Sequence, residues 1–146
     1  MKNTQQAFTM IELVFVIVVL GILSAIAIPR FSATRTDAQI SKARADIASI
    51  RSGIITERQS RLITGTNSFI STANMDNGGL FGGVLTYPIT SATTDGHWER
   101  TATDVNTSTY VYRVNGNTNQ FKYTASSGIF TCVKDATAPE CADLTD

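Results

Sequence analysis

A single carboxylate, Glu12, lies at the start of a long apolar run near the amino terminus of this 146-residue chain. The run LVFVIVVLGILSAIAI covers residues 13–28, and when it is extended back to Phe8 it covers 21 residues. As a helix, this stretch is about 31 Å long, which matches a membrane hydrocarbon core of roughly 30 Å. An ionisable group in such a span costs about 2–3 kcal/mol or more toward the centre. Glu12 is therefore a candidate functional residue; the alternative is that it lies in the lipid headgroup region.

The apolar run has three interpretations: a cleaved secretory signal, a plain membrane anchor, or a more specialised segment. Lys2 supplies the basic start of a secretory signal, but the run is long for one and the sequence Ile28-Pro29-Arg30 is a poor cleavage site. A plain anchor fits the length and leaves the carboxylate without a role.

The residue order around Glu12 resembles the amino-terminal signature of type IV pilins and pseudopilins. The resemblance lies in Ala7-Phe8-Thr9-Met10-Ile11-Glu12-Leu13, followed by the apolar run and Ile28-Pro29. It implies a leader, residues 1–7, that a prepilin peptidase removes between Ala7 and Phe8, and methylation of the new Phe8 amine. It also places Glu12 at the fifth position of the mature chain, where the family carries its glutamate. The residue before the cut is usually glycine in this family and is Ala7 here.

The resemblance also gives Glu12 a chemical role. Methylation keeps the charge of the Phe8 amine, and Glu12 follows four residues later, one helical turn away. In a filament, a lone carboxylate among apolar helices is heavily penalised, and pairing with the Phe8 amine of a neighbouring subunit cancels most of that cost. We therefore expect Glu12 to fix the register of assembly.

Gly21 and Pro29 bracket a stretch of this helix that we expect to be weak. Glycine lowers helix propensity by up to ~1 kcal/mol, and proline removes a backbone donor and disturbs the preceding turn. Both residue types are also common in membrane helices, so neither is informative alone. In related filaments the corresponding stretch loses helix during assembly, and the matching spacing implies the same here.

Residues 30–63 are predicted to continue the helix as an amphipathic half, up to about Arg61. One apolar stripe repeats at spacings of three and four residues. It consists of Ile40, Ala43, Ile47, Ile50 and Ile54, and the opposite face carries Arg35, Lys42, Arg44, Asp46, Arg51, Arg58 and Arg61. A basic amphipathic helix can lie on a membrane surface. Because the stripe is narrow and lacks aromatic residues, we favour a helix packed on its own head.

Residues 64–146 are predicted to form a β-rich head. The segments Thr109–Val114 and Gln120–Thr124 indicate a hairpin around an Asn-Gly turn, and Ile129–Val133 indicates a third strand. Residues 64–108 carry no clear assignment, although Leu80-Phe81 and Val84-Leu85 are expected to anchor that connection to the core. The whole is an α+β arrangement: a long helix, with a membrane half at residues 8–29, packed on a small antiparallel sheet.

Cys132 and Cys141 enclose eight residues, and they are either reactive or metal-binding thiols or a structural disulfide. Two cysteines and one histidine make a poor structural zinc set, because such sites take four side chains. An exported head, which the resemblance implies, lies in an oxidising compartment where a disulfide is favoured. Many pilins close a carboxy-terminal loop in this way, whereas major pseudopilins of type II secretion often use bound calcium.

Two further features concern a metal and a modification. Four acidic residues near the carboxy terminus supply oxygen ligands suited to calcium, but their spacing matches no strict calcium loop, and a solvated acidic tail is the alternative. They are Asp135, Glu140, Asp143 and Asp146. Separately, Asn106 stands in an Asn-x-Ser acceptor for N-glycosylation, and the acidic residue two positions before it resembles the extended acceptor of some bacterial systems.

Composition narrows the function classes. The 12 basic and 12 acidic residues balance, which argues against nucleic-acid binding by bulk charge. Resolved along the chain, residues 30–63 carry +4 and residues 64–146 carry −4, which suggests that a basic helix of one copy faces an acidic head of another. His97 is the only histidine, and it lacks a surrounding nucleophile motif, so we expect a protein that is not an enzyme.

The resemblance implies a filament subunit in the bacterial inner membrane, spanning it once, with its head in the periplasm or in an extracellular filament. The main interpretation is a pseudopilin for type II protein secretion or DNA uptake. The alternatives are a true type IV pilus subunit and, less favoured, a membrane-tethered binding domain that never polymerises. The implied partners are copies of the chain, related minor pilins or pseudopilins, the prepilin peptidase and methyltransferase, the inner-membrane assembly platform and membrane lipid. No cofactor is expected apart from the calcium candidate.

Overall fold

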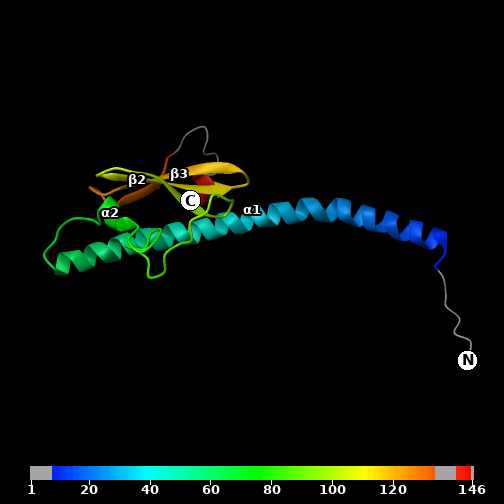
Figure 1. Cartoon of the computed structure of the whole chain (residues 1–146), viewed down its shortest axis with the longest axis horizontal. Helices are drawn as coiled ribbons and strands as arrows, with labels where there is room; N and C mark the ends of the chain where they lie inside the picture. The colour runs from blue at the N-terminus through cyan, green and yellow to red at the C-terminus, as the bar shows by residue number, and fades with distance from the viewer. Residues whose placement is uncertain (1–7, 134–140, 146) are drawn as a thin grey trace, which may run out of the picture. The chain divides into compact units, whose positions relative to one another are not determined.

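The computed structural model describes residues 8–133 and 141–145. The expected leader, residues 1–7, lies outside the described residues. The chain divides into two compact units, Met1–Arg35 and Thr36–Asp146, and each is described by itself. Helix α1 (Met10–Ile63) contributes to both units (Figure 1).

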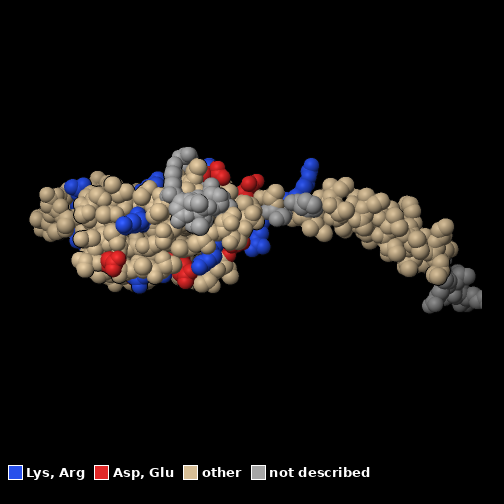
Figure 2. All heavy atoms as spheres, turned by 90° about the horizontal axis from the view of Figure 1, so that it is seen from above, with Lys and Arg blue, Asp and Glu red and all other residues tan. Residues whose placement is uncertain are grey.

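In the first unit, α1 carries the apolar run and buries almost none of it. All side chains from Phe8 to Ile26 are exposed. The most apolar 18-residue window has a mean hydropathy of 2.9 and is 0% buried, and by length and composition the helix can cross a membrane. On the face that Figure 2 shows, the amino-terminal part of α1 is uniformly uncharged, whereas charged side chains are scattered over the head.

In the second unit, α1 presents the predicted stripe to the sheet. Ala43, Ile47, Ile50 and Ile54 are each at most 2% exposed and belong to the core, and Ile40 packs against it in part. Burying an isoleucine side chain in this way contributes about 1.5–3 kcal/mol. The amphipathic assignment is confirmed. The membrane-surface alternative is wrong, because the sheet already covers the apolar stripe.

The sheet is an antiparallel meander in the order β1-β2-β3-β4 (Figure 1). Its strands are β1 (Trp98–Thr103), β2 (Thr107–Val114), β3 (Asn117–Thr124) and β4 (Ile129–Cys132). The predicted hairpin and third strand are confirmed, but the hairpin turn is shorter than expected. Val114 pairs directly with Asn117, so the turn is only Asn115-Gly116. Their φ angles are +51° and +77°, and a two-residue hairpin turn with positive φ at both positions is one that Asn-Gly pairs favour.

The core between helix and sheet is aromatic. Trp98, Phe121 and Phe130 lie in mutual contact, with ring centroids 5.0 Å apart for Trp98–Phe121 and 5.4 Å for Phe121–Phe130. Tyr112 and Tyr123 are also fully buried, and their hydroxyls donate to the carbonyl oxygens of Gln39 and Ile70. Burial raises the pKa of both phenols to about 12, so both remain hydrogen-bond donors.

The connection from helix to sheet contains the short α2 (Thr72–Met75) and a tight turn that follows it. Leu80 and Phe81 are buried in the core, as expected, and Val84 and Leu85 pack against it in part. Asp76 organises this connection, because its carboxylate accepts hydrogen bonds from the backbone of Phe81 at 2.7 Å and from Arg100 at 2.8 Å. The arrangement is α+β, as predicted.

Candidate functional site: the amino-terminal segment of α1

Helix α1 begins at a capped end. The side-chain oxygen of Thr9 accepts a hydrogen bond from the backbone N–H of Glu12 at 3.3 Å, and the Thr9 carbonyl accepts the N–H of Leu13 at 3.2 Å. Thr9 is therefore the N-cap, and Phe8 precedes the helix. The pattern Thr-x-x-Glu before an apolar run is a capping-box signature, so this role was legible in the sequence, although we did not predict it.

Glu12 lies in the first turn of α1 and is exposed. A carboxylate there is favoured by the helix dipole, which is positive at the amino-terminal end. Within the part of the chain that the structure describes, no ion pair engages Glu12. Because α1 starts at Met10, Phe8 and Glu12 do not lie on one continuous helical turn in this chain.

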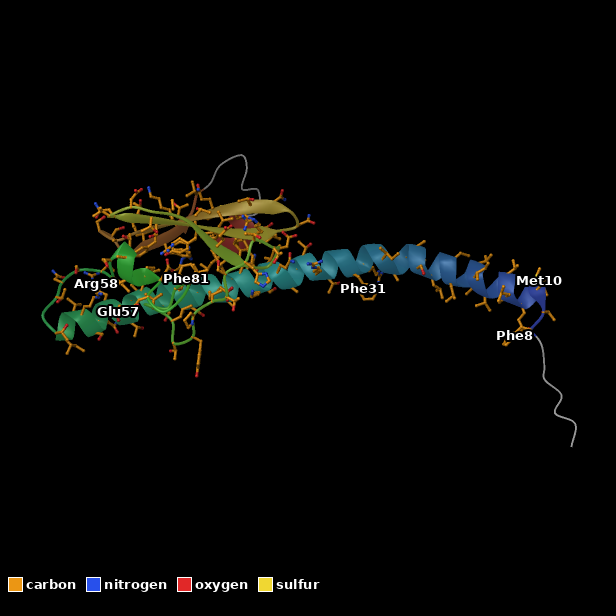
Figure 3. All side chains as sticks on the ribbon, viewed as in Figure 1. Phe8, Met10, Phe31, Glu57, Arg58 and Phe81 are labelled. Atoms are coloured by element: carbon orange, nitrogen blue, oxygen red, sulfur yellow. A yellow bond between two sulfur atoms is a disulfide. The ribbon has the colours of Figure 1, made fainter. Side chains whose placement is uncertain are left out.

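Large apolar side chains of the same segment also lack cover. Phe8 is 81% exposed, Met10 84% and Phe31 76%. Figure 3 shows the three side chains projecting away from the ribbon of α1. Exposed apolar surface on this scale marks membrane or protein interaction. Gly21 and Pro29 lie within α1, which is helical on both sides of each. A Cβ built on Gly21 meets no atom within 4 Å. That their stretch melts on assembly stays a prediction.

A disulfide links the carboxy-terminal helix of the second unit to the sheet. Cys132 of β4 and Cys141 of α3 (Cys141–Thr145) form a disulfide with a Cα–Cα distance of 5.9 Å. Leu144 of α3 is 1% exposed in the core. The Arg44 guanidinium of α1 donates to the backbone carbonyl of Asp143. The helix, the edge strand and the chain end are therefore held together.

Polar residues of α1 that were expected on its open face instead bind the head. Asp46 accepts a hydrogen bond from Trp98 Nε1 at 3.0 Å, Lys42 donates to the carbonyl of Gly96 at 2.6 Å, and Arg51 donates to the carbonyl of Phe130 at 3.1 Å. These positions flank the stripe, and their side chains reach sideways to atoms of the head. Three basic residues of the helix thus form hydrogen bonds within their own chain, namely Lys42, Arg44 and Arg51. That the basic helix of one copy faces the acidic head of another copy stays a prediction.

The acidic tail shows no metal set in the described residues. Asp143 is exposed, and no group of three potential ligands occurs where the structure describes the chain. Asp135, Glu140 and Asp146 lie outside the described residues, so the calcium prediction is not addressed. Asn106 is exposed in the loop between β1 and β2.

One surface groove of the head runs along α1. A groove of about 560 Å³ between α1 and the turn at residues 84–86 is lined by small and apolar side chains, without an acid or a histidine. Its lining residues are Ala48, Ser49, Ser52, Gly53, Thr56, Val84, Leu85 and Thr86. His97, the sequence's only histidine, contacts Thr94 and the carbonyl of Asp95 through Nδ1.

Comparison with known proteins agrees with this geometry. Residues 2–28 match the prokaryotic N-terminal methylation motif. The chain is 39% identical over 56 residues to type IV major fimbrial protein FimA of Dichelobacter nodosus, covering 38% of this chain and 36% of that protein. It is 42% identical over 57 residues to a fimbrial protein of Moraxella nonliquefaciens, covering 39% of this chain and 37% of that protein. The matched region spans little more than a third of these curated relatives. No solved structure matches the chain.

The amino-terminal third of the chain is thus similar to type IV fimbrial proteins, and residues 2–28 carry the N-terminal methylation motif. The matched region includes the apolar part of α1, which by length and composition can cross a membrane.

Proposed function

We propose that this chain is a subunit of a true type IV pilus, not a secretion pseudopilin as first favoured. The relatives that it matches are type IV fimbrial proteins, and a disulfide closes the carboxy-terminal loop of its head, as in many pilins. The observation that carries the proposal is the similarity of the amino-terminal third to type IV fimbrial proteins, over a capped apolar helix with Glu12 in its first turn.

Processing comes first in the proposed sequence of events. Prepilin peptidase removes residues 1–7 by cutting between Ala7 and Phe8, and the new Phe8 amine is methylated. The start of α1 at Met10 supports this order, because Phe8, the residue that would follow the cut, precedes the helix. Cleavage then leaves a cationic amine close to the helix N-terminus, where positive charge is disfavoured.

Glu12 compensates the positive charge of the Phe8 amine of a neighbouring subunit. In the filament, the Glu12 carboxylate of one copy pairs with the Phe8 amine of a neighbour, and the pairing offsets the desolvation of both charges. A pair that works only at one stagger of the helices fixes the register. The lack of an ion pair to Glu12 within the described chain supports this use.

Lipid and neighbouring copies cover the apolar segment in turn. Before assembly, the segment spans the inner membrane; during assembly, the platform in that membrane transfers it from lipid to the filament interior, where other copies and related minor pilins bury it. Its 0% burial within the chain supports an external cover at every stage. Gly21 and Pro29 give the helix a weak stretch that accommodates the packing.

The processing step is tested by the intact mass of the subunit purified from membranes and from filaments of its native host. We expect loss of residues 1–7 and one added methyl group on Phe8. An uncut chain in the filament fraction would contradict the proposal.

Pilus and secretion roles are separated by deleting the gene and restoring it. We expect deletion to remove surface filaments that shear from the cells and to impair adhesion or motility, while the set of secreted proteins is unchanged. Retention of normally secreted proteins in the periplasm, with surface filaments intact, would instead favour the pseudopilin function.

A further inference from the structure

The loop between β1 and β2 presents an asparagine, Asn106, to which the proposed function gives no role. Residues 104–108 read Asp-Val-Asn-Thr-Ser, so Asn106 and Ser108 form an Asn-x-Ser acceptor with an acidic residue two positions before the asparagine. Asn106 is exposed, and the side chain of Val105 is 88% exposed. The acceptor amide therefore lies at an open loop tip.

The loop is held by its main chain, not by the Asn106 side chain. Asp104 N–H donates to the carbonyl of Thr107 at 2.7 Å, and Ala125 N–H donates to the carbonyl of Asn106 at 2.8 Å. Thr72 of α2 donates to the carbonyl of Asp104 at 2.7 Å. Because these bonds use backbone atoms of the loop, replacing the Asn106 side chain leaves them in place.

The second half of the acceptor is closed in the folded head. Ser108 is 0% exposed, is paired with Tyr123 across the sheet, and has its hydroxyl 3.4 Å from that of Thr103. An enzyme that recognises the hydroxyl two residues after the asparagine cannot reach it once β2 has paired with its neighbours. The folded head thus exposes the amide and hides the residue that marks it for modification.

We propose that Asn106 is N-glycosylated, and that transfer occurs on the far side of the membrane before the head folds. The proposal rests on the export of the head that the proposed function requires. The donor class is an oligosaccharide linked to a lipid diphosphate. The Asn106 Nδ2 forms a bond to the anomeric carbon of the first sugar while that carbon's bond to the diphosphate oxygen breaks. The amide gives one proton to a base of the transferase, the lipid diphosphate leaves, and no group is oxidised or reduced.

The site is tested by intact mass of the full chain purified from its native host. We expect wild type to exceed the processed chain by a series of sugar increments, with more than a tenfold loss of that form in Asn106→Gln and Ser108→Ala. Thr107→Ala is the matched control, because it changes the neighbouring position and keeps the acceptor. A wild-type mass without increments, increments that survive in Asn106→Gln, or their loss in Thr107→Ala would each overturn the proposal.

The timing is tested with unglycosylated full-length chain in detergent, incubated with membranes that carry the transferase and the lipid-linked donor. We expect the folded wild-type chain to be modified at least tenfold more slowly than a chain carrying both Trp98→Ala and Phe121→Ala, which removes two central core side chains. Equal rates would overturn the claim that folding closes the acceptor.

The same mass spectra keep this proposal separate from the proposed function. Retention of residues 1–7 contradicts pilin processing, whatever the state of Asn106. A processed and methylated chain without sugar contradicts only the glycosylation.

Discussion

The two halves of α1 use the same kinds of apolar residue for opposite purposes. In the second unit, Ile47, Ile50 and Ile54 are at most 2% exposed beneath the sheet. In the first unit, Ile11 is 79% exposed and Ile17 is 58% exposed. One half therefore stabilises the fold of a single chain, whereas the other leaves its apolar surface uncovered within the described chain. If the proposed function is right, substitutions should change the stability of the head and the ability to assemble independently.

The sharpest test of this separation is one substitution made in both regions. Phe121→Ala removes a fully buried ring from the core, and we expect it to lower the unfolding free energy of the head by about 3–5 kcal/mol. Phe15→Ala removes a ring that is 68% exposed and should change it by less than about 0.5 kcal/mol. Denaturant unfolding of the full chain in detergent, followed by tryptophan fluorescence, measures both. Equal losses would mean that the two regions are not energetically separate.

The disulfide comes next in expected effect. Replacing Cys132 and Cys141 together by serine removes a short closed loop, and chain-entropy arguments give a loss of about 2–3 kcal/mol in the unfolding free energy of the head. Insertion of the apolar segment into membranes should be unchanged, which carbonate extraction checks. An unaltered unfolding midpoint would show that the core alone holds α3 in place.

A smaller effect is expected at the bond between α1 and the central tryptophan. Asp46→Ala leaves the buried Trp98 Nε1–H without its acceptor and should cost about 1–3 kcal/mol, because a buried donor without an acceptor loses its solvation. Asp37→Ala, an exposed aspartate on the same helix, is the matched control and should cost less than about 0.5 kcal/mol. Denaturant unfolding compares the two variants, and similar costs would refute the specific role of Asp46.

The smallest effect concerns the first turn of the apolar half. Thr9→Val removes the capping oxygen and should destabilise that turn by about 0.5–2 kcal/mol, which hydrogen exchange at the Glu12 amide detects in micelles. Thr9→Ser should restore protection. Thr34→Val removes a hydroxyl that bonds to the carbonyl of Arg30 in mid-helix, and it should leave the Glu12 amide unchanged. Unchanged exchange of the Glu12 amide in Thr9→Val would contradict the role of Thr9 as the N-cap.

The elements that could be predicted from the sequence are those whose apolar residues recur at regular intervals. The apolar stripe of α1 and the alternation in β2 and β3 follow from periods of about 3.6 and 2 residues, and both are confirmed. Strand β1 was not predicted, because residues 99–103 show no alternation of apolar and polar side chains. The strand lies at the edge of the sheet, and its register is irregular between Arg100 and Ala102. Such a strand is defined by its partner and not by its own pattern.

The hydrogen bonds made by residues beside the apolar stripe could not be predicted from the sequence either. Asp46 and Arg51 are polar, so their types predict solvent, yet both bond to atoms of the head because their side chains flank the buried face. Which flanking positions meet a donor or an acceptor depends on the register of helix and sheet, which one sequence does not state. The cap at Thr9, by contrast, was legible, since a Thr-x-x-Glu pattern specifies it locally.

The central claim is that the carboxylate at the start of the apolar half acts between copies. Its most direct test is the yield of filaments sheared from cells that express Glu12→Gln, compared with Glu57→Gln, which makes the same change on the same helix where Glu57 pairs with Arg61 at 3.0 Å. The account predicts that Glu12→Gln abolishes filaments while its head unfolds normally, and that Glu57→Gln assembles like wild type. Normal filament yield from Glu12→Gln would contradict it.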